Sequence, residues 1–196
     1  VGGAVRDKLM GNPIKDIDLC IDLPNGGIEF ATWIMKTLGE FKQDTRPVVY
    51  PTYGTAMFTL LAFPGIDIEC VQTRKEQYHD SNSRNPETAY GTLEEDCYRR
   101  DLTINSLYQN ISTDEIVDIT GKGIDDIKNQ IIRTPCDPNI TYTDDPLRML
   151  RCIRFASRYG WEIEEKTMQG IIDNVERIQN ITQERVTDEI NKILLT

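Results

Sequence analysis

The sequence has few of the residues on which many enzymes and secreted proteins depend. Its single histidine, His79, lies in a polar stretch, so a catalytic triad based on histidine is not expected. The five cysteines show no CxxC motif and no Cys/His pairing, which argues against a zinc site and indicates reduced thiols rather than a disulfide framework. They are Cys20, Cys70, Cys97, Cys136 and Cys152. No apolar run approaches the ~18 residues of a membrane span, and no signal-peptide pattern is present. We therefore expect a cytoplasmic protein without a membrane partner.

Positive charge is also scarce. The 196 residues include 22 Lys and Arg against 32 Asp and Glu, a net charge of −10. Proteins that bind nucleic acid are usually basic over the contact surface, so we expect either that RNA binding is local and weak here, or that most of the binding surface is missing because this sequence is a piece of a longer protein. The second interpretation is favoured by the ends of the sequence. It begins without Met at VGG, where we expect a strand to be running already, and it stops within an amphipathic helix, INKILLT.

Two acids near the N-terminal end form the most informative pattern. Asp16 and Asp18 alternate with apolar Ile17 and Leu19, so in a strand the acids share one face and the apolar residues face a core. Two carboxylates that close repel each other by roughly 1 kcal/mol at 4 Å in water and about four times that near a protein surface. A cation would relieve this repulsion, and carboxylate oxygens are ligands that Mg²⁺ takes beside substrate phosphates. An isolated DxD is equally compatible with a solvated strand face.

Two glycines and an arginine precede this pattern. Gly2 and Gly3 allow backbone N–H groups to approach a phosphate, and Arg6 adds a charged fork. A Gly-Gly pair alone usually marks only a turn. The order GGxxRD, a short loop and then DxD is far more specific. It resembles the signature of the nucleotidyltransferase superfamily, in the branch that holds the class II CCA-adding tRNA nucleotidyltransferases and the bacterial poly(A) polymerases.

Two further motifs carry the resemblance. RRDLTIN at residues 99–105 is similar to the family motif RRDFTIN, with Leu102 in place of Phe. DDPLRMLRCIRFA at residues 144–156 resembles the EDxxR motif and the arginines after it, with Asp144 where Glu is usual. The three motifs stand in the family's order, and the resemblance covers essentially the whole sequence.

The resemblance implies a fold and an activity. The fold is α+β: a nucleotidyltransferase head like that of polymerase beta, with a mixed or antiparallel sheet, over residues 1–138, then an all-helical neck over residues 139–196. The activity is template-independent addition of CMP and AMP from CTP and ATP to the 3′ end of tRNA, with two Mg²⁺ ions held by Asp16 and Asp18. A poly(A) polymerase or an enzyme that adds only A shares every motif, and a non-catalytic nucleotide- or RNA-binding module also remains open.

The resemblance also assigns a third acid and a ribose site. By its sequence alone, Glu69 is an exposed acid on a strand over residues 66–71, and antiparallel pairing would bring it to the DxD strand. The family has a third catalytic carboxylate on a neighbouring strand, which implies this role for Glu69. The resemblance further implies that Arg100, Asp101 and Asn105 line the ribose and phosphate side of the nucleotide. A carboxylate and an amide can hydrogen-bond a ribose hydroxyl.

The last motif is expected to read the base. Plain chemistry allows Asp145 and Arg148 to form an ion pair within a helix, stabilising by about 0.2–0.5 kcal/mol. In the family the second acid and the arginine pair with the incoming base, which maps to these two residues. A carboxylate can accept from the amino group of cytosine or adenine, and a guanidinium can donate to ring nitrogen or carbonyl acceptors. Arg151 and Arg154 are expected near the triphosphate or the base-reading edge.

Hydrophobic periodicity and turn residues predict the remaining elements. Thr92 begins a helix with a capping box, and this helix is expected to run into RRDLTIN. The loop over residues 74–92 holds Arg84, a candidate phosphate or RNA contact. Pro135 and Pro138 mark a linker. The other predicted elements are a helix over 28–38, strands over 48–50, 55–61 and 66–71, a strand-turn-strand-helix-strand run over 106–133, and helices from Thr143 to Gly160, over 164–178 and over 182–196.

Overall fold

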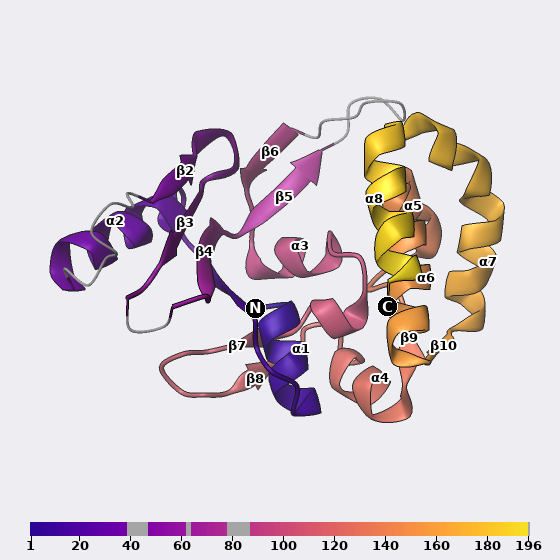
Figure 1. Cartoon of the computed structure of the whole chain (residues 1–196), viewed down its shortest axis with the longest axis horizontal. Helices are drawn as coiled ribbons and strands as arrows, with labels where there is room; N and C mark the ends of the chain where they lie inside the picture. The colour runs from indigo at the N-terminus through magenta and orange to yellow at the C-terminus, as the bar shows by residue number, and fades with distance from the viewer. Residues whose placement is uncertain (39–46, 62–63, 78–86, 196) are drawn as a thin grey trace. The chain divides into compact units, whose positions relative to one another are not determined.

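The computed structural model describes residues 1–38, 47–61, 64–77 and 87–195, and Figure 1 labels its elements. The chain forms two compact units, each assembled from separate stretches of sequence. The first unit comprises Val1–Lys75, Thr88–Asp96 and Tyr108–Val117, and the second comprises Glu76–Glu87, Cys97–Leu107 and Asp118–Thr196. The predicted boundary between a head and a neck at residue 138 stays a prediction. Arg84 lies outside the described residues.

The first unit is built on a four-stranded mixed sheet with the order β1-β4-β3-β2. β4 runs parallel to β1, and β3 is antiparallel to both β4 and β2. The prediction that β4 pairs antiparallel with the DxD strand was wrong. The chain passes through α2, β2 and β3 between these strands, and so long a connection allows a parallel partner. The bounds are β1 (Asp16–Ile21), α2 (Gly26–Leu38), β2 (Val48–Tyr50), β3 (Thr55–Thr59) and β4 (Asp67–Gln72).

The core of this unit lies between α2 and the sheet (Figure 1). Ile17 and Leu19 pack against it, which confirms that the apolar residues of β1 face the core. A side chain at Gly27 would collide with the carbonyl oxygens of Cys70 and Gly54, so the glycine allows α2 to approach the strands closely. The buried members of the cluster are Ala31, Ile34, Ala56, Phe58, Ile68 and Cys70.

The first residues form a helix rather than the expected strand. α1 (Gly3–Met10) follows Gly2, whose φ of 68° turns the chain into the helix, and Gly11 ends it at φ 71°. Glycine adopts this left-handed region without steric cost. The backbone nitrogen of Val1 donates to the Asp18 carbonyl at 2.7 Å, which ties the segment before α1 to β1.

The polar stretch after β4 also differs from its prediction. Its described residues form a two-stranded sheet of β5 (Arg74–Gln77) and β6 (Glu87–Tyr90), where a loop was expected. α3 (Leu93–Tyr98) begins with the predicted capping box: the Glu95 N–H donates to Thr92 Oγ1 at 3.1 Å, and the Thr92 N–H donates to Glu95 Oε2 at 2.8 Å.

The predicted continuation of α3 into RRDLTIN was wrong. The helix ends at Tyr98, and Thr103–Asn105 form the separate 3₁₀ turn η2. Asp101 explains the break, because its carboxylate accepts from the Leu102 N–H at 2.9 Å and competes with helical hydrogen bonding.

The segments that follow match the predicted order of strand, turn, strand, helix and strand. β7 (Tyr108–Gln109) and β8 (Ile116–Val117) form a hairpin in the first unit. α4 (Gly123–Asn129) and β9 (Ile131–Ile132) belong to the second unit, where β9 pairs with β10 (Glu162–Ile163).

The helices α5 to α8 make up most of the second unit, and α8 lies along α6 (Figure 1). Their bounds are α5 (Pro138–Asp144), α6 (Leu147–Tyr159), α7 (Glu165–Asn174), the 3₁₀ turn η3 (Val175–Asn180) and α8 (Gln183–Leu194). The buried cluster is Leu102, Ile104, Ile132, Tyr142, Met149, Cys152, Phe155 and Ile171. None of the helices in the described part of the chain has the length and apolar character needed to cross a bilayer.

The break between α5 and α6 corrects two predictions. Pro138 begins α5 instead of lying in a linker, and Thr143, the predicted cap of the EDxxR helix, lies inside α5. The chain breaks at Asp145, which is extended at φ −143° and ψ 102°. A residue before proline is biased away from the helical region, so Pro146 places the break there. α6 ends at Gly160, as predicted, with φ 67°.

Candidate active site

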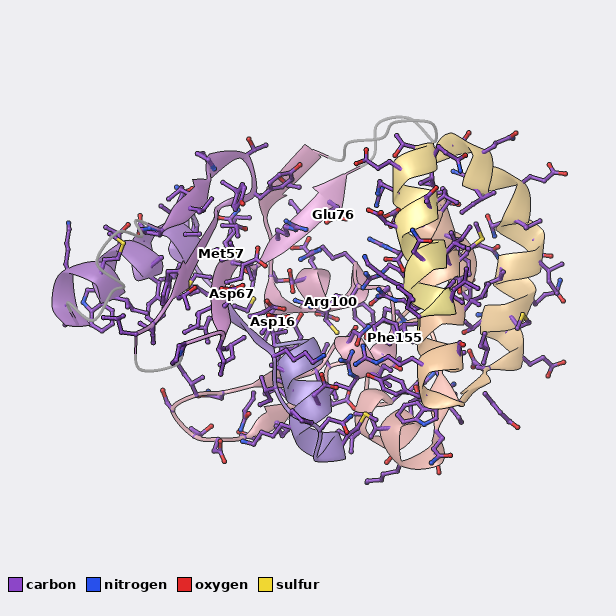
Figure 2. The ribbon with its side chains drawn as sticks, viewed as in Figure 1. Asp16, Met57, Asp67, Glu76, Arg100 and Phe155 are labelled. Atoms are coloured by element: carbon purple, nitrogen blue, oxygen red, sulfur yellow. The ribbon has the colours of Figure 1, made fainter. Side chains whose placement is uncertain are left out.

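The three predicted catalytic acids lie on the neighbouring strands β1 and β4. The parallel register pairs Asp16 with Asp67 and Asp18 with Glu69. Figure 2 labels Asp16 and Asp67, the first of these pairs. Asp16 is exposed, whereas Asp18 and Glu69 are half-buried. The structure therefore sets Glu69 directly beside the second acid of the DxD motif.

The carboxylates of Asp18 and Glu69 at this edge of the sheet repel each other. Burial raises the pKa of Glu69, and the neighbouring Asp18 raises it further, while Arg74 acts in the opposite direction. A neighbouring like charge disfavours ionisation, so the Asp18 carboxylate adds to the larger effect of burial on the pKa of Glu69. The arrangement favours a positively charged ligand at this edge of the sheet.

The carboxylates of Asp16 and Asp18 could supply some, but not all, of the ligands of a magnesium ion. Within the four stretches of chain given above, no group of three or more His, Cys, Asp or Glu side chains is placed to hold a metal ion. Mg²⁺, however, is usually held by only one or two carboxylates together with water and substrate phosphates. Asp16 and Asp18 on one strand face meet that requirement. Such an ion would depend on a bound triphosphate for its other ligands.

The predicted phosphate-binding residues lie around the start of α1. Arg6 is buried, and its guanidinium donates two hydrogen bonds to the Asp7 carboxylate, from Nε to Oδ1 at 3.0 Å and from Nη2 to Oδ2 at 2.9 Å. A Cβ atom at Gly3 would lie 3.5 Å from Nη2 of Arg6. Gly3 thus brings bare backbone close to the Arg6 guanidinium, which is held in place by its ion pair with Asp7.

The RRDLTIN motif forms a hydrogen-bonded turn in the second unit. Asp101 Oδ1 accepts from the Leu102 N–H at 2.9 Å and from Asn105 Nδ2 at 3.1 Å. Arg100 Nη1 donates to the Asn105 carbonyl oxygen at 3.4 Å. The structure therefore brings together the three residues predicted to line the ribose.

Arg151 joins this turn from α6. Its Nε donates to Asp101 Oδ2 at 2.8 Å, and its Nη2 lies 2.7 Å from the same oxygen. Burial alone would raise the pKa of Asp101, but the Arg151 charge and the hydrogen bonds from Asn105 and Arg151 outweigh it and hold that pKa below its usual range. Asp101 is thus a buried, ionised carboxylate.

The two residues predicted to read the base do not pair with each other. Asp145 Oδ2 accepts from Arg185 Nη2 at 2.9 Å, and its Oδ1 accepts from the Leu147 N–H at 3.1 Å. Arg148 Nη2 lies 3.4 Å from Glu76 Oε2. Each member of the predicted template is therefore oriented by a partner of its own.

Asp144 and Arg154, two other residues of the last motif, also lie among charged groups. Burial raises the pKa of Asp144, and Glu76 raises it further, while Arg148 opposes the shift. Arg154 lies 3.3 Å from Glu189 and over the Phe155 ring, 4.9 Å from its centroid. The structure thus places Arg154 in the packing of α6 against α8.

Sequence reasoning missed the partners that orient these groups. Figure 2 labels Glu76, which pairs with Arg148 and also with Arg99 at 3.0 Å. Arg185 and Glu189, both on α8, were likewise not predicted to take part. Glu76 and Arg148 are 72 residues apart, and no local pattern in the sequence links residues at such a separation.

Two family descriptions match the sequence. The Poly A polymerase head domain matches residues 1–133, and the probable RNA and SrmB-binding site of polymerase A matches residues 160–196. Among curated relatives, the tRNA nucleotidyltransferase cca1 of Schizosaccharomyces pombe is 40% identical over 205 residues, which cover 98% of this chain and 40% of that protein. The mitochondrial CCA tRNA nucleotidyltransferase of Saccharomyces cerevisiae is 38% identical over 209 residues, covering 99% of this chain and 37% of that protein.

Solved structures show the same similarity. The CCA-adding enzyme of Bacillus stearothermophilus in complex with CTP has a TM-score of 0.76 at 28% identity, covering 99% of this chain and 43% of that chain. A tRNA nucleotidyltransferase complexed with a primer tRNA and an incoming ATP analog has a TM-score of 0.79 at 26% identity, covering 99% of this chain and 54% of that chain. The α+β fold with its mixed sheet and helical C-terminal part is confirmed.

The chain spans about two-fifths of the length of these curated relatives. The head-domain match nevertheless covers more than half of the chain and includes both the DxD and the RRDLTIN motifs. The resemblance drawn from the three motifs is therefore confirmed, and the chain belongs to the poly A polymerase head-domain family, among relatives named CCA-adding tRNA nucleotidyltransferases.

Proposed function

We propose that the protein adds CMP and AMP from CTP and ATP to the 3′ end of tRNA, completing the CCA terminus. The observation that carries the proposal is the register of β1 and β4, which sets Glu69 beside Asp18 on the DxD strand. The names of the relatives and the CTP bound to the Bacillus enzyme support this substrate class. Residues 1–138 would act as the catalytic head and residues 139–196 as the start of the neck.

The acids of the first unit would carry the metal. Asp16 and Asp18 would hold Mg²⁺, which when bound neutralises triphosphate charge and activates the attacking hydroxyl. Glu69 adds to the negative potential beside Asp18. Gly2 and Gly3, together with the Arg6 charge, receive the phosphates. In the reaction the RNA 3′-oxygen bonds to the α-phosphorus while the bond to pyrophosphate breaks.

The second unit would select the nucleotide. Arg100, Asp101 and Asn105 line the ribose in this proposal. Asp145 accepts from the amino group of cytosine or adenine, and Arg148 donates to an acceptor on the same base edge. Both side chains have to keep a defined orientation for this reading, and Arg185 and Glu76 supply it in the structure.

Poly(A) synthesis is the second candidate, and the descriptions of both matching families favour it. It uses the same chemistry and differs in the number of additions and in base choice. A non-catalytic binding module is less well supported, because such a module has no need for adjacent acids that repel each other.

One assay separates these functions. The full-length protein is incubated with Mg²⁺, each nucleoside triphosphate singly, and tRNA that lacks its last one, two or three nucleotides. CCA synthesis gives additions of C and C and then one A, depending on the missing nucleotides. Unlimited addition of A identifies a poly(A) polymerase, and no incorporation from any triphosphate leaves only the binding module.

The proposed compartment is the cytoplasm. The Saccharomyces relative is named mitochondrial, so mitochondria are the alternative compartment to test. Imaging of the tagged full-length protein in its own cells tests this, and a purely mitochondrial signal would contradict it.

A further inference from the structure

Arg151 and Asp101 form a tight ion pair at the RRDLTIN turn. The Arg151 guanidinium approaches Asp101 Oδ2 with both Nε, at 2.8 Å, and Nη2, at 2.7 Å. The Asp101 side chain is only 8% exposed, and that of Arg151 is 35% exposed. Hydrogen bonds between ionised groups are shorter and about twice as strong as neutral ones. This contact therefore fixes the Asp101 carboxylate more firmly than a surface ion pair would.

The Asp101 carboxylate in turn orients the side-chain amide of Asn105. Asp101 Oδ1 accepts from Asn105 Nδ2 at 3.1 Å and from the Leu102 N–H at 2.9 Å. A carboxylate accepts but cannot donate, so the amide must turn its NH₂ group toward Asp101. The carbonyl oxygen of the Asn105 side chain is then directed away from the carboxylate. A rotation of Asp101 would break the hydrogen bond that sets the orientation of this amide.

Removing the guanidinium would leave Asp101 as a buried charge without its strongest partner. An uncompensated buried carboxylate takes up a proton or moves toward water. A protonated carboxyl becomes a donor and no longer dictates the direction of the Asn105 amide. Arg151 thus controls two features of the turn: the position of the Asp101 carboxylate and the orientation of the Asn105 side-chain amide.

We infer that Arg151 is a positioning residue that orients the Asp101–Asn105 pair and thereby sets the preference for ribonucleotides over 2′-deoxyribonucleotides. The inference rests on the proposed function, in which this pair faces the ribose, and it gives Arg151 a role distinct from the expected contact with the triphosphate or the base. Its action is indirect, through the ion pair with Asp101.

The first test measures sugar and base preference separately. The full-length protein and its Arg151→Gln variant extend tRNA that lacks the final A, with ATP or 2′-deoxyATP. In the variant the ATP preference, as a ratio of kcat/KM values, should fall about tenfold, the factor expected for the loss of one well-formed hydrogen bond. The preference for CTP over UTP on tRNA lacking CCA should not change.

Four further variants sharpen this test. Arg151→Lys keeps the charge but not the fork, so it should give an intermediate sugar preference and carries the test if Arg151→Gln does not fold. Asp101→Asn should lose at least as much sugar preference as Arg151→Gln, and the double variant should lose no more than Asp101→Asn alone. Arg158→Gln, an exposed arginine of the same helix, should match the unaltered protein. A retained sugar preference with an altered base preference in Arg151→Gln would overturn the inference.

The second test needs no activity. Hydrogen–deuterium exchange of peptides spanning residues 99–107 should be faster in Arg151→Gln than in the unaltered protein, and unchanged in Arg158→Gln. Equal exchange in all three proteins would overturn the positioning role. If the unaltered protein incorporates no nucleotide, the proposed function fails, whereas faster exchange in Arg151→Gln would still establish the positioning of the turn.

Discussion

The acids of the two units differ in what neutralises them. On β1 and β4, Asp18 and Glu69 stand side by side, and their mutual repulsion contributes to the raised pKa of Glu69. In the second unit the acids proposed to bind the nucleotide lie against arginines, as in the pairs of Asp101 with Arg151 and of Asp145 with Arg185. The first arrangement favours an external cation. The second is already balanced, so its chemistry depends on the orientation that each arginine imposes.

The comparison separates two kinds of functional residue. Two adjacent like charges cost stability, and a bound cation would relieve their repulsion, so substitution of one of them should affect activity more than folding. A paired buried acid supports the fold as well as the site, so its substitution should affect both. The predictions below run from the largest expected effect to the smallest.

Asp18→Asn tests the repelling pair. Loss of a metal ligand should lower nucleotide incorporation by about a thousandfold or more, because a bound metal ion supplies several kcal/mol of transition-state stabilisation. Stability should not fall, since one of two like charges is removed. Primer extension and urea unfolding measure the two effects.

Asp67→Asn is the matched control for this variant. Asp67 is an exposed acid on β4 that accepts from Thr59 Oγ1 at 2.8 Å, and its loss should leave incorporation nearly unchanged. A normal rate in Asp18→Asn, or an equal loss in both variants, would show that the metal assignment is wrong.

Asp101→Asn tests a paired acid. Breaking a buried ion pair should lower the free energy of unfolding by about 3 kcal/mol at neutral pH. The pKa of Asp101 is lower in the folded protein than its unfolded value of about 3.9, so its stabilisation is present above that pH and is lost as the pH falls through the folded pKa. The difference between the two proteins in urea unfolding should therefore shrink below about pH 4.

The control for this prediction is Asp125→Asn, which removes the exposed ion pair of Asp125 with Lys128. Such a pair contributes about 0–1 kcal/mol, so this variant should unfold nearly as the unaltered protein does. If the difference in unfolding free energy between Asp101→Asn and the unaltered protein stays constant down to about pH 3, Asp101 is not ionised in the folded protein.

Arg148→Ala tests the base-reading arginine. The preference for C and A over U and G should fall by about tenfold, in line with the 1–3 kcal/mol that a good contact to a base edge provides. Competition between triphosphates in single-nucleotide extension measures it, with Arg158→Ala as the control. Unchanged selectivity would move base choice to other residues.

Arg185→Ala should have the smallest effect. The Arg185 side chain is 47% exposed, so its ion pair with Asp145 should contribute less than about 1 kcal/mol to stability. Asp145 keeps the Leu147 N–H as a donor, and base preference should fall only a few-fold. Thermal unfolding and the same competition assay check this. A loss as large as that of Arg148→Ala would mean that Arg185 itself contacts the base.

The sequence predicted the parts of the site whose residues are close along the chain. The face shared by Asp16 and Asp18 follows from strand alternation, and the capping box at Thr92 follows from a three-residue spacing. It did not predict the parallel pairing that places Glu69, because strand direction depends on the path of the intervening chain. The break at Asp145 was also missed, although Pro146 gave a local signal for it.

The sequence by itself determined the family, the order of the three motifs and the carboxylate strand, because these depend on residue type and on spacing along a few residues. Only the tertiary structure decided which arginine pairs with each of the acids Asp101 and Asp145. Asp101 is 50 residues from Arg151, and Asp145 is 40 residues from Arg185. Such pairs form when separate segments pack around one core, and burial of that core, rather than any local preference, brings their charges together.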